Sequence, residues 1–160
     1  MKILVLSDSH SAISFMRLAV KSICPHAIIH LGDHYDDGEV IAQENPHIPV
    51  HQVPGNCDRF RCDPTLPQFL CYDVCGVRLF MSHGHLHGVK SNPYRLIADA
   101  CKYGAQVALF GHTHEPVCFQ QEGMWILNPG TCGTFGGSVG LIETENGQII
   151  RCAILHQTDF

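Results

Sequence analysis

The sequence has few charged residues and no strongly basic segment. Lysine and arginine total 10 of 160 residues, against 15 aspartates and glutamates, which gives a formal net charge of −5 at pH 7. Attachment to nucleic acid or to anionic lipid by charge alone requires a basic surface that neutralises phosphates. The composition therefore excludes strong nucleic-acid binding of that kind, and the lack of low-complexity runs excludes a disordered chain.

Long apolar runs are also lacking. The first apolar stretch, Met1 to Leu6, ends at the polar pair Ser7 and Asp8, so it is too short for a signal peptide or a membrane span. We therefore expect a cytoplasmic protein without membrane contact. The chain is expected to form one domain, residues 1–160, large enough to bury roughly two-thirds of the surface that it exposes when unfolded.

The nine cysteines follow no disulfide framework. Their number is odd and their spacings repeat no pattern, so we expect free thiols that act as small apolar residues. Cys57, Cys62, Cys71 and Cys75 are the group closest to a zinc cluster, but neither pair has the two-residue gap of a zinc ribbon. We therefore expect no thiolate metal site.

Apolar periodicity predicts an alternation of strands and helices in the first third of the chain. Buried strands are expected at 2–6, 27–31 and 48–53, with helices at 11–22 and 38–44 between them. This order is typical of a βαβαβ unit with parallel strands. The rest predicts a hairpin at 68–81, a helix at 93–103, a strand at 106–110 and a meander of strands from Val117 onward.

Polar residues with metal-binding side chains follow five of the predicted strands. They are Asp8 with His10, Asp33, Asn56, His83, and His112 with His114. Successive groups are 23 to 29 positions apart, about the length of one strand–crossover–strand unit. Because ligands of open α/β sheets bind beyond the carboxyl ends of the strands, we expect these seven side chains to converge.

The seven side chains offer carboxylate, amide and imidazole ligands and no thiolate. Such a set suits divalent manganese, iron, nickel or zinc, and Mn²⁺ is the expected ion. One cation with seven protein ligands would have no open position for water, whereas two cations that share a carboxylate would each keep one. The sequence therefore predicts two divalent cations with Asp33 between them, although each residue alone is also a common cap or turn residue.

The order of these motifs resembles the calcineurin-like metallophosphoesterase superfamily, and within it the small single-domain bacterial and archaeal phosphodiesterases. The motifs are Asp8-Ser9-His10, Gly32-Asp33, Gly55-Asn56-Cys57-Asp58, His83-Gly84-His85, Gly111-His112-Thr113-His114 and Asn128-Pro129-Gly130-Thr131. The resemblance implies an α/β fold, a four-layer α/β/β/α sandwich of two mixed β-sheets flanked by helices. It also implies a homo-oligomer, either a dimer or a tetramer.

By motif position, the resemblance implies two metal sites that share Asp33. The first would be formed by Asp8, His10, Asp33 and His114, and the second by Asp33, Asn56, His83 and His112. A hydroxide that bridges the cations would attack phosphorus in line, because coordination lowers the pKa of water to about 7 and the cations neutralise phosphate oxygens. The implied activity is hydrolysis of a small-molecule phosphate ester, most simply by a phosphodiesterase.

Cys57 stands where most superfamily members have a histidine that contacts phosphate or protonates the leaving group. A thiol is a poorer proton donor to an alkoxide than an imidazolium, so diesters are expected to be preferred to alkyl monoesters. Asp58 loses the imidazole that it would orient, and His85 is the candidate for the missing contact with phosphate, unless it is a solvated loop residue. The candidate catalytic residues are therefore Asp33, Cys57, Asp58 and His85.

Several other residues are expected to have no catalytic role, and other functional classes of protein are alternatives. Arg59 is expected to be exposed and His87 to be non-catalytic, and ordinary structural or surface roles are expected for His26, His30, His34, His47, His51 and His156. A metallo-β-lactamase-like site would leave Asp8 and His10 without a role. The remaining alternatives are a non-catalytic protein-interaction scaffold on the same fold, as in a retromer subunit, and a phosphomonoesterase or nuclease of the same superfamily.

Overall fold

Two five-stranded sheets pack face to face at the centre of the computed structural model, which describes residues 1–133 and 136–160. The first sheet has the order β10-β9-β1-β2-β3. Its strands are β1 (Lys2–Leu6), β2 (Ala27–His30), β3 (Val50–Gln52), β9 (Ser138–Glu145) and β10 (Gln148–His156). β1, β2 and β3 are parallel, and β9 pairs antiparallel with both of its neighbours, so the sheet is mixed.

The second sheet has the order β4-β5-β6-β8-β7. Its strands are β4 (Phe69–Val74), β5 (Val77–Ser82), β6 (Val107–Leu109), β7 (Val117–Gln121) and β8 (Met124–Asn128). The three central strands are parallel, and the two edge strands are antiparallel to their neighbours. The predicted hairpin at 68–81 is confirmed as β4 and β5.

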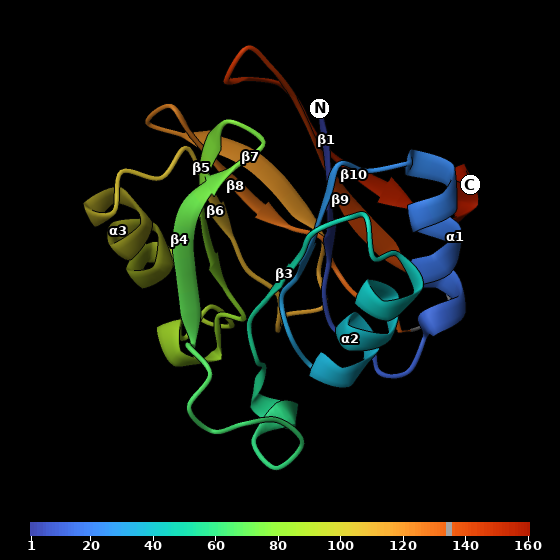
Figure 1. Ribbon diagram of the computed structural model, residues 1–160. Helices are drawn as coiled ribbons and strands as arrows, with labels where there is room; N and C mark the ends of the chain where they lie inside the picture. Colours follow the sequence, from blue (N-terminus) through green and yellow to red (C-terminus); the bar gives the residue numbers. More distant parts are fainter. Residues whose placement is uncertain (134–135) are drawn as a thin grey trace.

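Helices cover the outer face of each sheet, as Figure 1 shows. The helices α1 (Ile13–Ile23) and α2 (Tyr35–Glu44) lie against the first sheet, and α3 (Tyr94–Lys102) lies against the second. Three short 3₁₀ turns complete the secondary structure of the described residues: η1 (Asn56–Asp58), η2 (His85–His87) and η3 (Gln157–Asp159). The predicted four-layer α/β/β/α sandwich is thereby confirmed.

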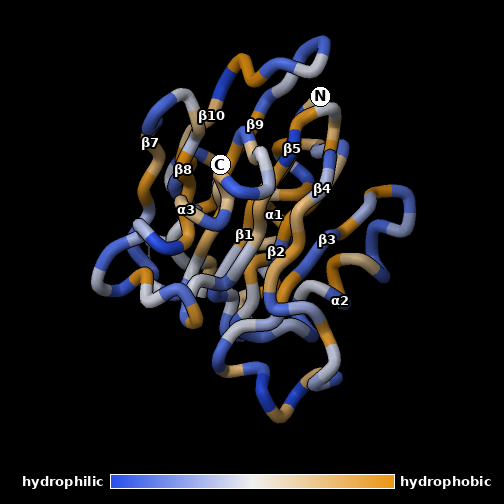
Figure 2. The backbone as a smooth tube through the Cα atoms, turned by 90° about the vertical axis from the view of Figure 1, so that its left-hand side faces the viewer, coloured by the Kyte–Doolittle hydropathy of each residue, from blue (hydrophilic) through white to orange (hydrophobic). Residues whose placement is uncertain are grey.

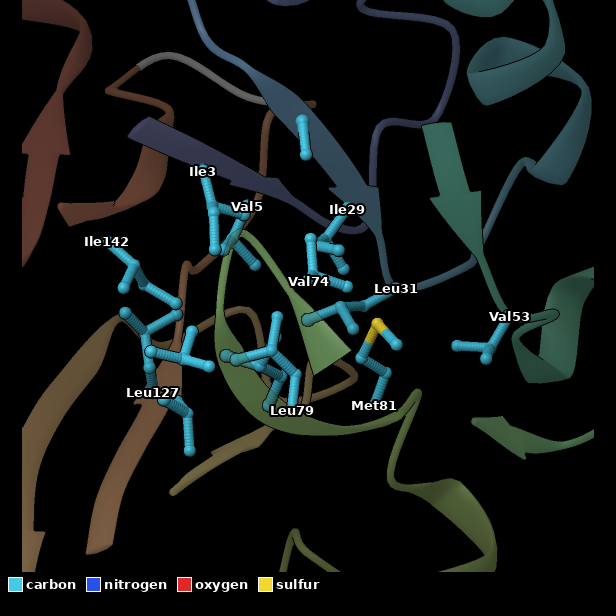
Figure 3. Packing of buried hydrophobic residues seen from close by; sticks show 14 residues of the cluster. Ile3, Val5, Ile29, Leu31, Val53, Val74, Leu79, Met81, Leu127 and Ile142 are labelled. Carbon is cyan, nitrogen blue, oxygen red and sulfur yellow. The ribbon is translucent and has the colours of Figure 1, made fainter. Parts of the chain in front are cut away.

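The main apolar core fills the space between the two sheets. In Figure 3, Ile3, Val5 and Ile29 of the first sheet face Leu79 and Met81 of the second. Alternate residues of the same strands point outward and pack under the helices, as Leu4 and Ile28 do beneath α1 and α2. Figure 2 shows hydrophobic residues concentrated in the strands and hydrophilic residues in the loops. Burial on both faces explains why these strands have continuous apolar sequences.

The prediction of a strand meander from Val117 onward is wrong at one step. β7 with β8 and β9 with β10 are antiparallel pairs, but β8 pairs parallel with β6, and β9 belongs to the other sheet. The chain crosses between the sheets through residues 129–137, of which 134–135 lie outside the described residues. Within the described part, no helix combines the length and the apolar character that crossing a membrane requires.

Candidate metal centre

The seven predicted side chains lie at one end of the sandwich, beyond the carboxyl ends of five parallel strands. Asp8 follows β1, Asp33 follows β2, Asn56 follows β3, His83 follows β5 and His112 follows β6. Contacts of 3.1 to 4.0 Å join His10, Asp33, His83 and Asn56 across the two sheets, and a contact of 3.1 Å joins Asp8 to His114, whose ring centroid lies 5.3 Å from that of His10. The His112 amide donates to Asp8 at 3.0 Å, and the His112 ring centroid lies 5.1 Å from that of His83. The first sheet supplies four of these side chains and the second sheet supplies three.

The first group comprises Asp8, His10, Asp33 and His114, each of which offers one ligand atom within 4.8 Å of the others. One oxygen of Asp8, Oδ2, accepts hydrogen bonds from Ser7 Oγ (2.6 Å) and from the His112 amide (3.0 Å). The other oxygen, Oδ1, is buried without a hydrogen-bond partner and lies 3.1 Å from His114 Nε2. Since an unpartnered buried carboxylate oxygen is costly, this group fits a cation.

The second group is built around His83. Its Nδ1 lies 2.7 Å from the carbonyl oxygen of Leu31, so the ring N–H donates there and Nε2 keeps a lone pair. That Nε2 lies 3.1 Å from Asn56 Oδ1 and 3.5 Å from Asp33 Oδ1. Three atoms with lone pairs repel one another at such distances unless a cation lies among them, and a backbone partner for the second ring nitrogen is typical of metal-binding histidines.

Asp33 lies between the two groups, with one oxygen toward each. Oδ1 faces His83, and Oδ2 is 4.0 Å from His10 Nε2. Burial raises the pKa of the Asp33 carboxyl, but His83, the Cys57 amide and His10 lower it more, so the pKa lies below its ordinary value. The carboxylate is therefore ionised at neutral pH, in the form that binds a cation.

Five of the seven residues have left-handed backbone conformations that residues other than glycine rarely adopt. Their φ angles are positive, at 51° for Asp8, 43° for His10, 56° for Asp33, 67° for His112 and 62° for His114. Each such residue costs on the order of 1–3 kcal/mol, and backbone strain of this kind is concentrated at functional sites. These backbone conformations therefore lower the stability of the fold while they direct the five side chains.

Glycines let the loops after β2 and β3 touch backbone to backbone. A Cβ atom on Gly55 would lie 2.2 Å from Asp33 Oδ1, and a Cβ on Gly32 would lie 2.4 Å from the Gly55 nitrogen. A side chain at position 55 would displace Asp33, and one at position 32 would displace the backbone of Pro54 and Gly55. This contact explains why glycine directly precedes both Asp33 and Asn56.

Asp58 is fully buried, and both of its carboxylate oxygens are already engaged. Oδ2 accepts hydrogen bonds from the amides of Asp33 (2.9 Å) and Gly55 (2.8 Å), and Oδ1 accepts from those of His34 (2.8 Å) and Tyr35 (2.9 Å). The same carboxylate thus fixes the loop that carries Asp33 and caps the first turn of α2.

Cys57, which replaces the histidine of most superfamily members, and His85, the candidate contact with phosphate, border the two groups. Asn56 Nδ2 lies 3.4 Å from the Cys57 sulfur, and burial together with a hydrogen bond to Asp33 raises the pKa of the thiol to about 11. The ring of His85 lies 5.4 Å from that of His83 and 6.1 Å from that of His112, measured between centroids, and its Nδ1 is buried without a partner. Burial and His83 lower the pKa of His85.

A pocket of about 520 Å³ adjoins this end of the molecule. Asn56 and His85 form the wall toward the metal-site residues, and Arg59, Pro64 and Leu86 contribute to the rest. Arg59 was expected to be merely exposed; it is exposed, and it also lines this pocket. Sequence patterns gave no signal for the pocket, because its walls come from two loops separated in the chain.

His87, which was expected to be non-catalytic, has structural partners. Its Nε2 lies 3.4 Å from Asp99 Oδ2 of α3, and its Nδ1 lies 3.2 Å from Ser82 Oγ. Both ring nitrogens are thereby directed to neighbouring side chains, which accords with a role in holding η2 against α3.

A further group that sequence reasoning missed lies behind Asp8 and His10. Ser9 Oγ donates to Asp37 Oδ2 (2.7 Å) and lies 3.1 Å from Nε2 of the buried His30. The Ser11 amide donates to the same Asp37 oxygen at 2.8 Å. Asp37 also lies with His34 and Asp36 in a group that could hold a metal ion by distance, but its hydrogen bonds already fix the loop after β1. The serines on both sides of His10 were the available signal.

Comparisons with known proteins agree with this geometry. The model of the calcineurin-like phosphoesterase superfamily domain matches residues 1–147. A phosphodiesterase of Methanocaldococcus jannaschii is 27% identical over 163 residues, which cover 91% of this chain and 94% of that protein.

Two solved structures share the fold at low sequence identity. A predicted phosphoesterase from Streptococcus pneumoniae superposes with a TM-score of 0.76 at 20% identity, over 98% of this chain and 90% of that one. Vacuolar protein sorting 29 from Cryptosporidium parvum gives a TM-score of 0.73 at 17% identity, over 97% of this chain and 96% of that one. At these identities the likeness shows the fold alone.

Proposed function

The chain belongs to the calcineurin-like phosphoesterase superfamily, and from this premise we propose that it is a phosphodiesterase that uses two divalent cations, with Mn²⁺ as the expected ion. The observation that carries the proposal is the convergence of oxygen and imidazole ligands around Asp33, with the buried Asp8 Oδ1 left without a partner. The substrate class is a small phosphate diester.

The proposed ligand sets follow the two groups described above. Asp8, His10, Asp33 and His114 would hold the first cation, and Asp33, Asn56, His83 and His112 the second. When bound, the cations supply an activated water as nucleophile at neutral pH and positive charge opposite the phosphate oxygens.

Neighbouring backbone and side-chain groups keep these ligands in their binding form. The Leu31 carbonyl fixes the tautomer of His83, and the Ser7 hydroxyl together with the His112 amide fixes the carboxylate of Asp8. Burial and the neighbouring His83 lower the pKa of His112 to about 4. Its imidazole is therefore neutral at pH 7, and a neutral ring keeps the lone pair that a metal requires.

Two features support a diester as substrate. Since the pKa of Cys57 is about 11, its thiol stays protonated at neutral pH but is a weak donor to an alkoxide leaving group. The pocket beside Asn56 and His85 has room, at about 520 Å³, for the second organic substituent of a diester. A monoester would leave this pocket empty. We also propose that His85, at the edge of the pocket, contacts the phosphate.

The proposal is tested with purified protein that has been chelated and then reloaded with Mn²⁺. We expect about two equivalents of metal by mass spectrometry, and hydrolysis of an aryl phosphodiester faster than that of the matching aryl monoester, in a panel that includes cyclic nucleotides. His83→Ala is expected to lower kcat at least 10³-fold, because it removes a metal ligand. The matched control is His87→Ala, which removes a nearby histidine outside the two groups and should retain activity.

Replacement of Cys57 by histidine tests the proposed preference for diesters. An imidazolium protonates an alkoxide better than a thiol does, so Cys57→His should raise kcat/KM for an alkyl monoester relative to that for the diester by about 10-fold or more. An unchanged ratio in a variant that still binds two metal ions would show that Cys57 does not set the preference.

A non-catalytic scaffold is the second candidate function, favoured by the fold likeness to vacuolar protein sorting 29. Retention of all seven predicted ligands argues against it, because a scaffold does not require them. A protein that binds two equivalents of metal yet hydrolyses no ester in the panel would favour the scaffold over the enzyme.

A further inference from the structure

Two cysteine thiols meet where the edge strands of the two sheets come together. Cys118 belongs to β7 at the edge of the second sheet, and Cys152 belongs to β10 at the edge of the first. Their sulfur atoms are 3.4 Å apart, and both thiols are free. Figure 2 shows β7 and β10 side by side, and the sulfur contact places them together in space.

The pair lies at the rim of the core between the sheets. Both side chains are half-buried and pack against its apolar residues, so the pair is neither sealed inside the core nor fully open to solvent. Cys24, Cys57 and Cys101 are exposed instead and have no cysteine sulfur in hydrogen-bond contact within the described residues. The arrangement of Cys118 and Cys152 therefore differs from that of the surface thiols.

Little movement separates this contact from a covalent bond. A disulfide has a sulfur–sulfur distance of about 2.05 Å, so the sulfurs need to approach by roughly 1.3 Å from 3.4 Å, which side-chain rotation can provide. The hydrogen bond between the two thiols lowers the pKa of Cys118. Because the thiolate is the attacking species in exchange, Cys118 is the sulfur that would react first.

We propose that Cys118 and Cys152 are a modification site that forms a reversible disulfide by exchange with a low-molecular-weight disulfide such as glutathione disulfide. The Cys118 thiolate attacks one sulfur of the reagent, a mixed disulfide forms, and one glutathione thiol leaves with the proton. The sulfur of Cys152 then attacks Cys118, and the second glutathione thiol leaves with the other proton. Two protein thiols are oxidised and one disulfide is reduced to two thiols.

The bond would tie the two sheets together at their edges. It would close a loop between positions 34 apart in the sequence, and a loop of that size constrains the unfolded chain considerably. A chain of 160 residues is expected to gain roughly 10 °C in Tm from such a bond.

The test uses the full chain, equilibrated in glutathione buffers of increasing oxidised fraction, then alkylated, digested and mapped by mass spectrometry. We expect a crosslinked peptide pair containing Cys118 and Cys152 within one molecule, a Tm higher by roughly 10 °C, and reversal of both by dithiothreitol. Cys152→Ser should abolish the crosslink and the shift, whereas Cys101→Ser, at an exposed cysteine, should leave both unchanged.

The readout is independent of hydrolysis, so failure of the proposed activity would not affect it. The proposal is overturned if Cys118 and Cys152 are still alkylated separately when Cys24 is fully converted to its glutathione adduct. It is overturned equally if each carries its own glutathione and no crosslink forms in a protein whose wild-type Tm shows that it is folded.

Discussion

The carboxylate of Asp58 accepts hydrogen bonds from four backbone amides, three of them in the loops after β2 and β3 and the fourth at Tyr35, the first residue of α2. The sequence motif suggested a catalytic role in which Asp58 orients a neighbouring group. With both oxygens engaged by the backbone, the geometry favours a positioning role that acts through Asp33. The motif could indicate that an acid is needed at this position, but not which atoms it contacts.

Asp58→Asn is expected to lower the free energy of unfolding by about 3 kcal/mol, because the amide NH₂ cannot accept the hydrogen bonds of two backbone amides. Metal affinity should fall with it, since Asp33 loses its support. Urea unfolding and calorimetric titration with Mn²⁺ measure the two effects. Asp73→Asn, at an exposed acid paired with Arg78 at 3.3 Å, is the control and should change stability by less than about 0.5 kcal/mol. A variant with unchanged stability and metal affinity would contradict the positioning role.

The residue types predicted which side chains form the candidate site, but they did not predict the contacts that hold those side chains in place. The seven proposed ligand residues stood out because their types and spacing recur at strand ends, and the structure brings them to one end of the sandwich. The carbonyl of Leu31, which fixes His83, left no signal, because any residue offers a carbonyl. The Ser9–His30–Asp37 contacts were missed for a related reason, since short polar residues in a loop are common without function.

At the scale of the elements, the strands and helices were predictable in kind and order but less so in their ends. α2 begins at Tyr35, three residues before the predicted start at Gly38, because the Asp58 carboxylate caps it from a distant loop. The crossover from β8 to β9 was predicted as a meander, because strands buried on both faces give no sign of which partner they pair with. Hydrogen bonds between segments far apart in the sequence, rather than local periodicity, therefore set the start of α2 and the strand partners of β8 and β9.

The end of β8 supports the loop that carries His112 and His114. The side chain of Asn128 is buried; its Nδ2 donates to the Gly111 carbonyl (3.0 Å) and to Thr113 Oγ1 (2.9 Å), and its Oδ1 accepts from the Gly130 amide (2.9 Å). One amide thus joins the loop after β6 to the loop after β8.

Asn128→Ala is expected to cost about 2–3 kcal/mol of stability, because it leaves the Gly130 amide buried without its partner and removes one of the two hydrogen bonds that the Gly111 carbonyl accepts. It should also weaken Mn²⁺ binding, since His112 and His114 flank Thr113. Asn92→Ala is the control, because Asn92 is exposed and its side chain accepts a single hydrogen bond from the Tyr94 amide. Thermal unfolding with and without Mn²⁺ measures both effects, and an equal loss in the two variants would count against the linking role of Asn128.

At the scale of the whole molecule, acid stability should depend on a histidine outside the two ligand groups. His30 is fully buried in β2, and burial lowers its pKa from 6.5 to about 4. Between those values the unfolded chain binds a proton at this residue and the folded protein does not. The contribution of His30 to the stability of the fold is therefore present above pH 6.5 and is lost as the pH falls toward 4.

Because of the shift in the pKa of His30, the free energy of unfolding is expected to fall by about 3 kcal/mol between pH 6.5 and 4. Urea unfolding of chelated protein across this range should show a shallower decline for His30→Gln than for the wild type. His156→Gln, at an exposed histidine, should decline as steeply as the wild type. Parallel curves for all three proteins would show that acid stability is controlled elsewhere.

The pairing of β1 with β9 has a consequence for synthesis on the ribosome. Lys2 is in register with Glu143, so β1 lacks one neighbour until residues 138–145 have left the exit tunnel. All seven proposed ligand residues precede that segment, and a nascent chain therefore carries them all before the sheet that positions four of them is complete. Loading with metal should accordingly follow translation of β9, and an incomplete chain would expose the unpaired edge of β1 to chaperones and to other chains.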